Sequence, residues 1–217
     1  MTQTVALAKL RGVLDEVSAL FWTDAILYYY LDAGQTQVIQ TLLRIEEITR
    51  KTDKKFRHPD LVPLITAADI VFVSTTVGYA LPTYWLRTLS VEATYASVPA
   101  NGGTQVWATE ITLEELGHRR ANTYSIPTTS DPVYWIATIP TTGKAISFFP
   151  TPNYSATVTG GHKYYKIPTA VGSGQVFTLK EHLHEACVEY ALFMAFEQDG
   201  ETQQAQLPLQ NFLGMIK

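Results

Sequence analysis

The apolar residues of this chain follow a helical period at both ends and a period of two in the middle. Apolar residues recur at three- and four-residue steps through Arg50, which is typical of amphipathic helices. From Asp69 the period changes to two, as in strands with one buried face, and from Leu179 it is helical again. This order constrains the fold more than any other feature, and it predicts an α+β protein.

The simplest assembly of these segments packs the N- and C-terminal helices together as a helical bundle. A length of 217 residues fits one domain, or one core with an elaborated insertion. We therefore expect a discontinuous bundle domain made of residues 1–68 and 176–217. Residues 69–175 would form a β-rich insertion of antiparallel strands and hairpins.

A long helix is predicted to begin after Thr23, which suits an N-cap, and to end near Arg50. Asp24 places a carboxylate at the positive end of the helix dipole. Phe21 is expected to pack on Leu27 as a hydrophobic staple. The core-facing stripe is predicted to comprise Ile26, Tyr29, Tyr30, Ala33, Gln37, Thr41 and Ile45. Within this helix, Gly34 costs about 1 kcal/mol relative to Ala, which indicates close packing against a neighbouring element.

The strongest helical periodicity lies between Leu183 and Ala195, and Gly200 is expected to end that helix. A last helix is predicted at 203–216, kinked or restarted at Pro208. Where the two long helices meet, we expect a buried contact formed by Tyr29, Ala33, Ala186, Tyr190 and Met194.

Strands are predicted in the middle of the chain. Residues 133–139 and 144–149 form a hairpin in this prediction, and Gly160-Gly161 joins two further short strands. Thr112 and Glu115 make a capping box, which predicts a short helix over 113–120. The remaining predicted strands cover 70–73 and 86–95.

Composition excludes several classes of protein. A formal net charge of −4 argues against a protein that wraps nucleic acid, which would show a basic stripe. The single cysteine, Cys187, leaves no disulfide framework and suits a reducing cytoplasm. The most apolar run, Leu64–Val73, is too short to span a bilayer and contains Asp69. These features predict a soluble intracellular protein with no membrane partner.

A search for catalytic chemistry finds only weak candidates. Residues 141–144 resemble the end of a phosphate loop, but Thr138 stands where the first glycine belongs, so a hairpin turn is the better interpretation. On a helix His182 and His184 point about 200° apart and cannot share a metal, while His184 with Glu181 would be only half a site. Cys187 lies on the apolar stripe, as a buried structural cysteine does. We therefore predict no catalytic residue, no cofactor-binding residue, no metal ligand and no bound cofactor.

The aromatic residues of the β-rich region leave two interpretations open. They could form a stacking platform for single strands or sugars, or they could fill the core and a subunit interface. Little positive charge lies among them, which favours the second interpretation. The set comprises Trp85, Tyr95, Trp107, Tyr134, Trp135, Phe148, Phe149, Tyr164 and Tyr165.

A succession of short motifs runs along nearly the whole chain, up to the helix at 183–196 and the terminal helix. The motifs are LRGVLD at 10–15, FWTD at 21–24, LDAGQ at 31–35, YALP at 79–82, ISFFPTP at 146–152 and YYKIP at 164–168. Each motif alone is weak, and the specificity lies in their order. In this succession the chain resembles the head-to-tail adaptor (connector) proteins of tailed bacteriophages.

The resemblance implies a structural virion protein without enzymatic activity. Such proteins form a ring, commonly a dodecamer, below the portal protein in the viral neck, where they extend the DNA channel. They also dock the next tail component, such as a tail terminator, tail tube or tail nozzle protein. Assembly would take place in the host cytoplasm. Genomic DNA would pass the lumen without specific binding, which the acidic charge permits.

The loops near residues 98–105 and 151–161 are expected to face the next tail protein, because their composition suits exposed loops. A tail or receptor- and carbohydrate-binding β module of a phage particle remains the alternative. The helical ends argue against it, because a β module needs no amphipathic bundle.

Overall fold

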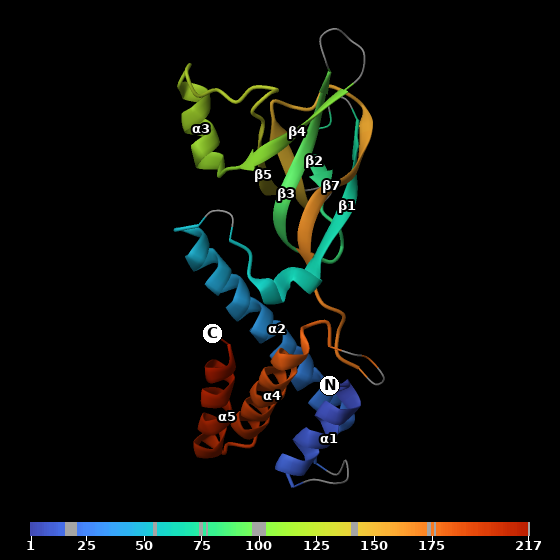
Figure 1. Cartoon of the computed structure of the whole chain (residues 1–217), viewed down its shortest axis with the longest axis vertical. Helices are drawn as coiled ribbons and strands as arrows, with labels where there is room; N and C mark the ends of the chain where they lie inside the picture. Colours follow the sequence, from blue (N-terminus) through green and yellow to red (C-terminus); the bar gives the residue numbers. More distant parts are fainter. Residues whose placement is uncertain are drawn as a thin grey trace. The chain divides into compact units, whose positions relative to one another are not determined.

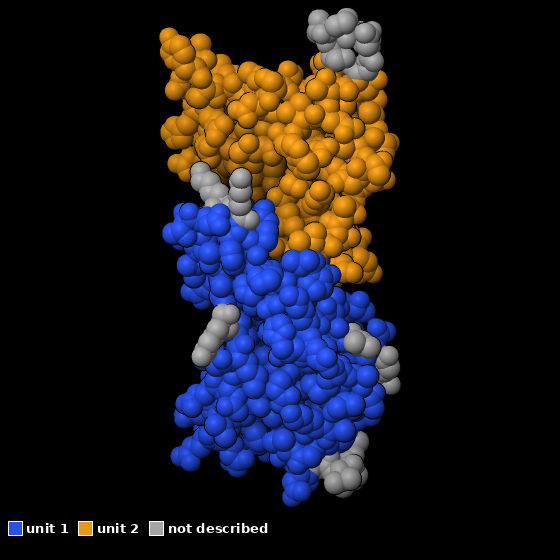
Figure 2. Space-filling view, in the orientation of Figure 1, with its two compact units in different colours: residues 1–64, 168–217 blue, residues 65–167 orange. Residues whose placement is uncertain are grey.

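The computed structural model of the chain describes residues 1–15, 21–53, 56–73, 76, 78–96, 103–139, 143–172, 175 and 177–216 (Figure 1). The chain divides into two compact units, coloured separately in Figure 2. Unit 1 comprises residues 1–64 and 168–217, and unit 2 comprises residues 65–167. Unit 1 holds all described α-helices except one, and unit 2 holds the sheet.

The α-helices of unit 1 are α1 (Gln3–Val13), α2 (Asp24–Arg50), α4 (His184–Gln198) and α5 (Thr202–Met215). Two short 3₁₀ segments, η1 (Pro59–Leu64) and η2 (Glu181–Leu183), complete it. Helix α2 packs against α4, α4 packs against α5, and α1 contacts both α2 and α4. The α+β class predicted from the change of period is confirmed.

Helix α2 begins and ends where the sequence predicts. The Thr23 side chain accepts a hydrogen bond from the Ile26 amide at 3.3 Å, so it is the N-cap. The predicted staple is wrong, because Phe21 stays exposed while Trp22 is buried. The Trp22 ring meets the Tyr30 ring edge-on, with centroids 5.9 Å apart.

The face of α2 that is buried differs from the predicted one. Of the predicted stripe only Tyr30 is buried, and Tyr29 is 65% exposed. The true stripe begins one residue later, and a shift of one residue turns a helix by about 100°. The buried stripe includes five large aliphatic residues of the helix, whereas the predicted one included the polar Gln37 and Thr41. The buried residues are Leu27, Tyr30, Leu31, Gly34, Gln35, Val38, Ile39, Leu42 and Glu46.

Gly34 lies directly against the backbone of α4, which confirms the predicted close packing. A Cβ atom at Gly34 would lie 3.1 Å from the carbonyl carbon and 3.2 Å from the Cα of Cys187, and nearer still to the carbonyl oxygen. Any side chain at Gly34 would therefore push the two helices apart.

The predicted contact between the long helices is only partly correct. Ala186 is buried, whereas Ala33, Tyr190 and Met194 are half-buried. The Tyr190 ring lies 5.1 Å from the Phe212 ring of α5, so this side of α4 faces α5. Helix α5 continues through Pro208 without a restart.

The connection that returns to α4 is held by side chains of α1 and α2. The buried Gln35 amide donates to the Thr169 carbonyl and accepts from the Thr178 amide, both at 3.1 Å. Asp32 accepts from the Val171 amide at 3.1 Å, and Gln3 accepts from the Gly172 amide at 3.0 Å. These contacts give the buried glutamines hydrogen-bond partners and anchor Thr169, Val171, Gly172 and Thr178 in unit 1.

Unit 2 is a seven-stranded sheet with the order β1-β7-β3-β4-β5-β6-β2. Neighbouring strands are antiparallel except β4 and β5, which are parallel and are connected through α3 (Leu113–Ala121). The prediction of antiparallel strands and hairpins is wrong at this pair. The strands are β1 (Ile65–Phe72), β2 (Gly78–Ala80), β3 (Trp85–Ala96), β4 (Gly103–Glu110), β5 (Val133–Ile139), β6 (Gly143–Phe149) and β7 (Ala156–Lys166).

Two strands extend further than the sequence predicts. β1 begins at Ile65, four residues before Asp69, and β7 is one continuous strand rather than a pair around Gly160-Gly161. Gly160 has φ +65°, and its amide donates to the Asp69 carboxylate at 2.8 Å. The two glycines therefore form a bulge opposite Asp69 instead of a turn.

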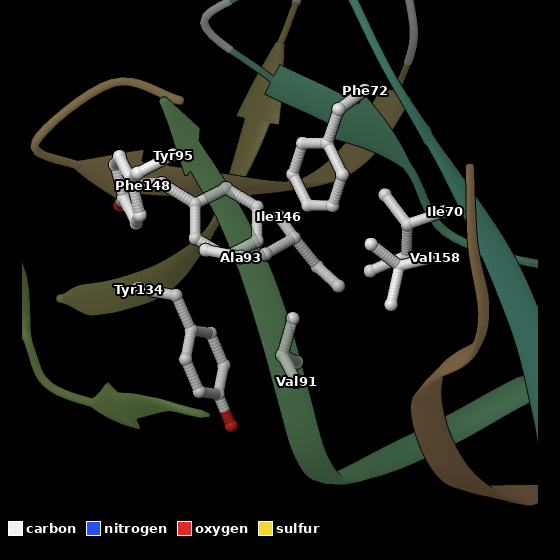
Figure 3. Packing of buried hydrophobic residues seen from close by; sticks show 9 residues of the cluster. All are labelled: Ile70, Phe72, Val91, Ala93, Tyr95, Tyr134, Ile146, Phe148 and Val158. Atoms are coloured by element: carbon white, nitrogen blue, oxygen red, sulfur yellow. The ribbon is translucent and has the colours of Figure 1, made fainter. Parts of the chain in front are cut away.

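Side chains from most strands of the sheet meet in one core (Figure 3). The ring of Phe72, on the edge strand β1, lies 4.8 Å from the ring of Tyr79, on the opposite edge strand β2. The sheet is therefore curled so that its two edges share the same core. The cluster comprises Ile70, Phe72, Val91, Ala93, Tyr95, Tyr134, Ile146, Phe148 and Val158.

Candidate assembly surface

The polar residues of α4 and its approach have structural contacts. His182 Nε2 lies 3.1 Å from Asp60 Oδ2, and His184 Nε2 lies 2.8 Å from the Leu179 carbonyl oxygen. The Lys180 ammonium also binds Asp60, at 3.0 Å. Burial alone would raise the pKa of the Asp60 carboxyl, but Lys180 and His182 together outweigh burial and lower it. His182 and His184 thus contact different groups and do not converge on one site.

Cys187 is fully buried in α4, as its place on the apolar stripe predicts. Burial raises the pKa of its thiol to about 12, and Sγ donates to the Leu183 carbonyl at 3.4 Å. A thiol kept protonated in this way is a poor nucleophile.

The weak phosphate-loop match lies partly outside the described residues, which exclude 140–142. β5 and β6 pair as an antiparallel hairpin, as predicted, and Gly143 has φ +72°. The Lys144 ammonium lies 5.3 Å from the centre of the Trp85 ring. Lys144 on β6 therefore has an aromatic partner on β3.

The described residues contain no group of three or more His, Cys, Asp or Glu side chains able to hold a metal ion. In the same ranges, no helix combines the length and apolar composition needed to cross a membrane.

A buried polar chain supports Trp85 from within the sheet. The Trp85 Nε1–H donates to Thr88 Oγ1 at 2.9 Å, and Thr88 Oγ1 lies 3.1 Å from His162 Nε2. Because the Thr88 oxygen accepts from Trp85, its own proton is available to His162. Burial lowers the pKa of His162 to about 4, so the ring is neutral at pH 7 and acts as the acceptor.

Most of the nine aromatic residues of the β region belong to the core. Tyr95, Tyr134, Phe148, Tyr164 and Tyr165 are buried, and Trp85, Trp135 and Phe149 are half-buried. Trp107 is 53% exposed on β4, with the Lys163 ammonium 5.6 Å from the centre of its ring. The described residues therefore present single exposed aromatics rather than a continuous stacking platform.

The predicted docking loops are described only in part. Residues 97–102 lie outside the described residues, and Gly103 to Gln105 belong to β4. In the second loop, residues 151–155 precede β7, which takes up Ala156 to Gly161. Asn153 Oδ1 accepts from the Ala96 amide at 2.8 Å, and a Cβ at Gly103 would collide with the Tyr154 ring. This second loop is therefore packed against the ends of β3 and β4.

A feature that the sequence analysis missed is the segment Asn122–Asp131 between α3 and β5, called the arm below. All of its residues except Pro127 are exposed, and Tyr124 is 100% exposed. Helix α3 is attached to the sheet by Leu116, which packs with Ile111 and Val133. The sequence of this segment, with Asn122, Thr123, Ser125 and Pro127, is a signal for turns but not for an interaction.

Unit 2 also carries a hollow of about 420 Å³, called the Trp85 hollow below. It is lined by residues 81–83, 85 and 86 together with Lys144 and Ile167. Both polar and apolar groups line it, and the half-buried Trp85 ring with Lys144 supplies an aromatic surface and a cation.

The described residues thus offer singly exposed apolar side chains and a hollow. A family model described as "SU10 adaptor protein" matches residues 1–217. No curated protein matches the chain. Because the match extends over the full length, through both helical ends and the sheet, the chain belongs to this family of phage head-to-tail adaptor proteins.

Proposed function

We propose that this chain forms a ring below the portal protein of a tailed phage, extends the DNA channel, and docks the next tail component. The observation that carries the proposal is the family match over residues 1–217. The adaptor family is structural, and a phage adaptor is a component of the virion. The copy number of twelve, the portal as partner, and a tail terminator, tail tube or tail nozzle protein as the next component belong to this proposal. So does assembly in the host cytoplasm.

In this proposal the two units have different roles. The helices of residues 1–64 and 168–217, which group together, form a bundle that supports the ring, and the β region is inserted into it. Tethers such as the Gln35 hydrogen bonds to Thr169 and Thr178 stabilise the return from the insertion. The net charge of −4 suits a lumen through which DNA slides without being held.

The absence of enzymatic activity is also part of the proposal. Its support is chemical: Cys187 is buried with a raised thiol pKa, and the histidines near it bind separate partners. A receptor- or carbohydrate-binding β module is disfavoured by the family match, which includes the helical residues that such a module does not need.

The direct test is the mass of the purified chain, alone and mixed with the portal protein of its phage, measured by native mass spectrometry. We expect a closed ring on the portal, with twelve copies per portal ring. A chain that stays monomeric and unbound in the mixture would refute the proposal.

Docking of the next tail component is tested in infected cells. Deleting residues 99–102 leaves the first strand residue, Gly103, in place. We expect particles that contain the adaptor and packaged DNA but lack tails or leak DNA. If the variant without residues 99–102 fails to join the portal, these residues face the head. If normal infectious particles form, these residues have no role in docking.

A further inference from the structure

We propose that the arm of one copy docks into the Trp85 hollow of the next copy, with Tyr124 as the anchor. This inference rests on the proposed ring and adds to it the residues that join neighbouring subunits. A ring requires two different complementary surfaces on each copy, so that every subunit both gives and receives a contact. The arm and the hollow would be such a pair.

The arm presents Tyr124 on an ordered turn. The Tyr124 amide donates to Asn122 Oδ1 at 3.1 Å, and the Ser125 amide donates to the Asn122 carbonyl at 3.0 Å. A second turn follows, in which the Asp131 amide donates to the Thr128 carbonyl at 3.1 Å. Because the backbone is already fixed, docking Tyr124 would cost little conformational entropy.

Folding of the chain gives no reason for an aromatic ring at this position. The Tyr124 side chain is 100% exposed, and Ile126 beside it is 44% exposed. Exposed single apolar residues are common, but tyrosine is enriched among the residues that dominate binding energy at interfaces. Tyr124 and Ile126 lie close together on one segment whose backbone is held by turns. This arrangement favours contact with a partner.

The basic residues at the end of α3 are occupied within their own chain. Arg119 Nη2 lies 2.7 Å from Glu115 Oε1, and the Arg120 guanidinium lies 5.1 Å from the centre of the Phe149 ring. The arm itself contains no Lys or Arg and carries the exposed carboxylate of Asp131. The docking element is therefore an aromatic and weakly acidic segment.

The Trp85 hollow has complementary chemistry. Its described lining residues include the cation Lys144 and no carboxylate. The 2.9 Å hydrogen bond from Trp85 to Thr88 orients the indole ring in the wall of the hollow. A tyrosine ring can lie beside Trp85 and Lys144 while its hydroxyl accepts from the Lys144 ammonium, and Asp131 adds an attractive charge. We therefore commit to a second copy of this chain as the occupant.

The proposal is tested by disulfide formation between copies. One preparation carries Thr123→Cys, which leaves Tyr124 in place beside it on the arm, and the other carries Thr83→Cys, at an exposed residue of the hollow. The two are mixed with the portal protein, oxidised and separated on a denaturing gel without reductant. The native Cys187 does not interfere because it is buried. A disulfide requires Cα atoms within roughly 7 Å, so a dimer band reports direct contact.

We expect a dimer band in the mixture and none with either preparation alone. Val71→Cys, at an exposed β1 residue outside the hollow, replaces Thr83→Cys in the control mixture and should give no band. In the otherwise native chain, Tyr124→Ala should weaken association between copies about tenfold or more, and Lys144→Glu should weaken it similarly.

Two results would overturn the inference, and they have different meanings. If the native chain forms rings but the Thr123→Cys and Thr83→Cys pair gives no dimer band, the arm docks elsewhere and the proposed function stands. If the native chain forms no ring with the portal, the proposed function fails and this inference fails with it.

Discussion

Gly34→Ala tests the packing of α2 against α4 more directly than any other single substitution. The added Cβ would lie 3.1 Å from the Cys187 carbonyl carbon and closer to its oxygen. These are backbone atoms of a helix, so they cannot rotate away as the end of a side chain could. The helices must separate to restore ordinary contact distances, and the neighbouring aliphatic contacts loosen with them.

Two opposing terms set the size of the effect. Alanine favours a helix over glycine by about 1 kcal/mol. Overpacking a well-packed contact costs about 1–3 kcal/mol, and a rigid backbone neighbour places this site near the upper end. We expect Gly34→Ala to lower the free energy of unfolding by about 1–2 kcal/mol. The matched control is Gly12→Ala in α1, where nothing lies within 4 Å of the added Cβ. It should raise the same free energy by up to about 1 kcal/mol.

The assay is urea unfolding followed by circular dichroism at a helical wavelength, because four of the five α-helices of the described residues lie in unit 1. We expect the free energy of unfolding to fall for Gly34→Ala and to rise for Gly12→Ala. A Gly34→Ala chain that is stabilised as much as Gly12→Ala would refute the close approach of α2 and α4.

Three further outcomes follow from buried polar groups. Gln35→Met should lower the free energy of unfolding by about 2–4 kcal/mol, since it leaves the Thr169 carbonyl and the Thr178 amide without a partner. The Cys187 thiol should resist alkylation at pH 8 in the native chain and react fully in urea, because burial raises its pKa to about 12. His162 has a folded pKa of about 4, below its ordinary 6.5, so the unfolded chain binds its proton more readily. The contribution of His162 to the free energy of unfolding is therefore fully present above pH 6.5. It is lost as the pH falls towards 4, and the loss is on the order of 2–3 kcal/mol.

Each of these outcomes has a clear contrary result. Unchanged urea midpoints for Gln35→Met would show that its hydrogen bonds contribute little. Rapid alkylation of native Cys187 would mean that α4 opens readily. For His162, the urea midpoints of the native chain and of His162→Gln are compared at pH 7 and pH 4.5, and equal pH dependence in both chains would exclude the proposed titration.

Local signals in the sequence were reliable wherever a few neighbouring residues decide the structure. The Thr23 N-cap fixed the start of α2, and the Thr112 side chain accepts from the Glu115 amide at 3.1 Å at the start of α3. The alternation of Val91, Ala93 and Tyr95 was correct, since all three face the core of the sheet. Such features depend on the chain within one turn or one strand, so sequence patterns capture them.

Predictions failed where contacts between segments far apart in the sequence determine the structure. The buried face of α2 is selected by the approach of α4 at Gly34, and Gln35 is buried because the return connection supplies its partners. Gly160-Gly161 resembles a turn in the sequence but forms a bulge, because Asp69 on another strand binds the Gly160 amide. The parallel pairing of β4 with β5 requires the intervening chain, which includes α3, to return to the start of the sheet pairing. The spacing of apolar residues does not predict such a connection.

The candidate assembly surface was invisible to sequence analysis for a different reason. Patterns of apolar residues report burial within one folded chain, and an apolar residue that serves a partner interrupts those patterns instead of extending them. In the sequence Tyr124 lies among Asn, Thr and Ser residues, and this composition predicts a loop. Only the folded chain shows that the loop is held by its own turns and that its aromatic ring touches nothing. An aromatic residue that folding leaves fully exposed on an ordered backbone therefore points to assembly, and contacts between copies are where its role must be measured.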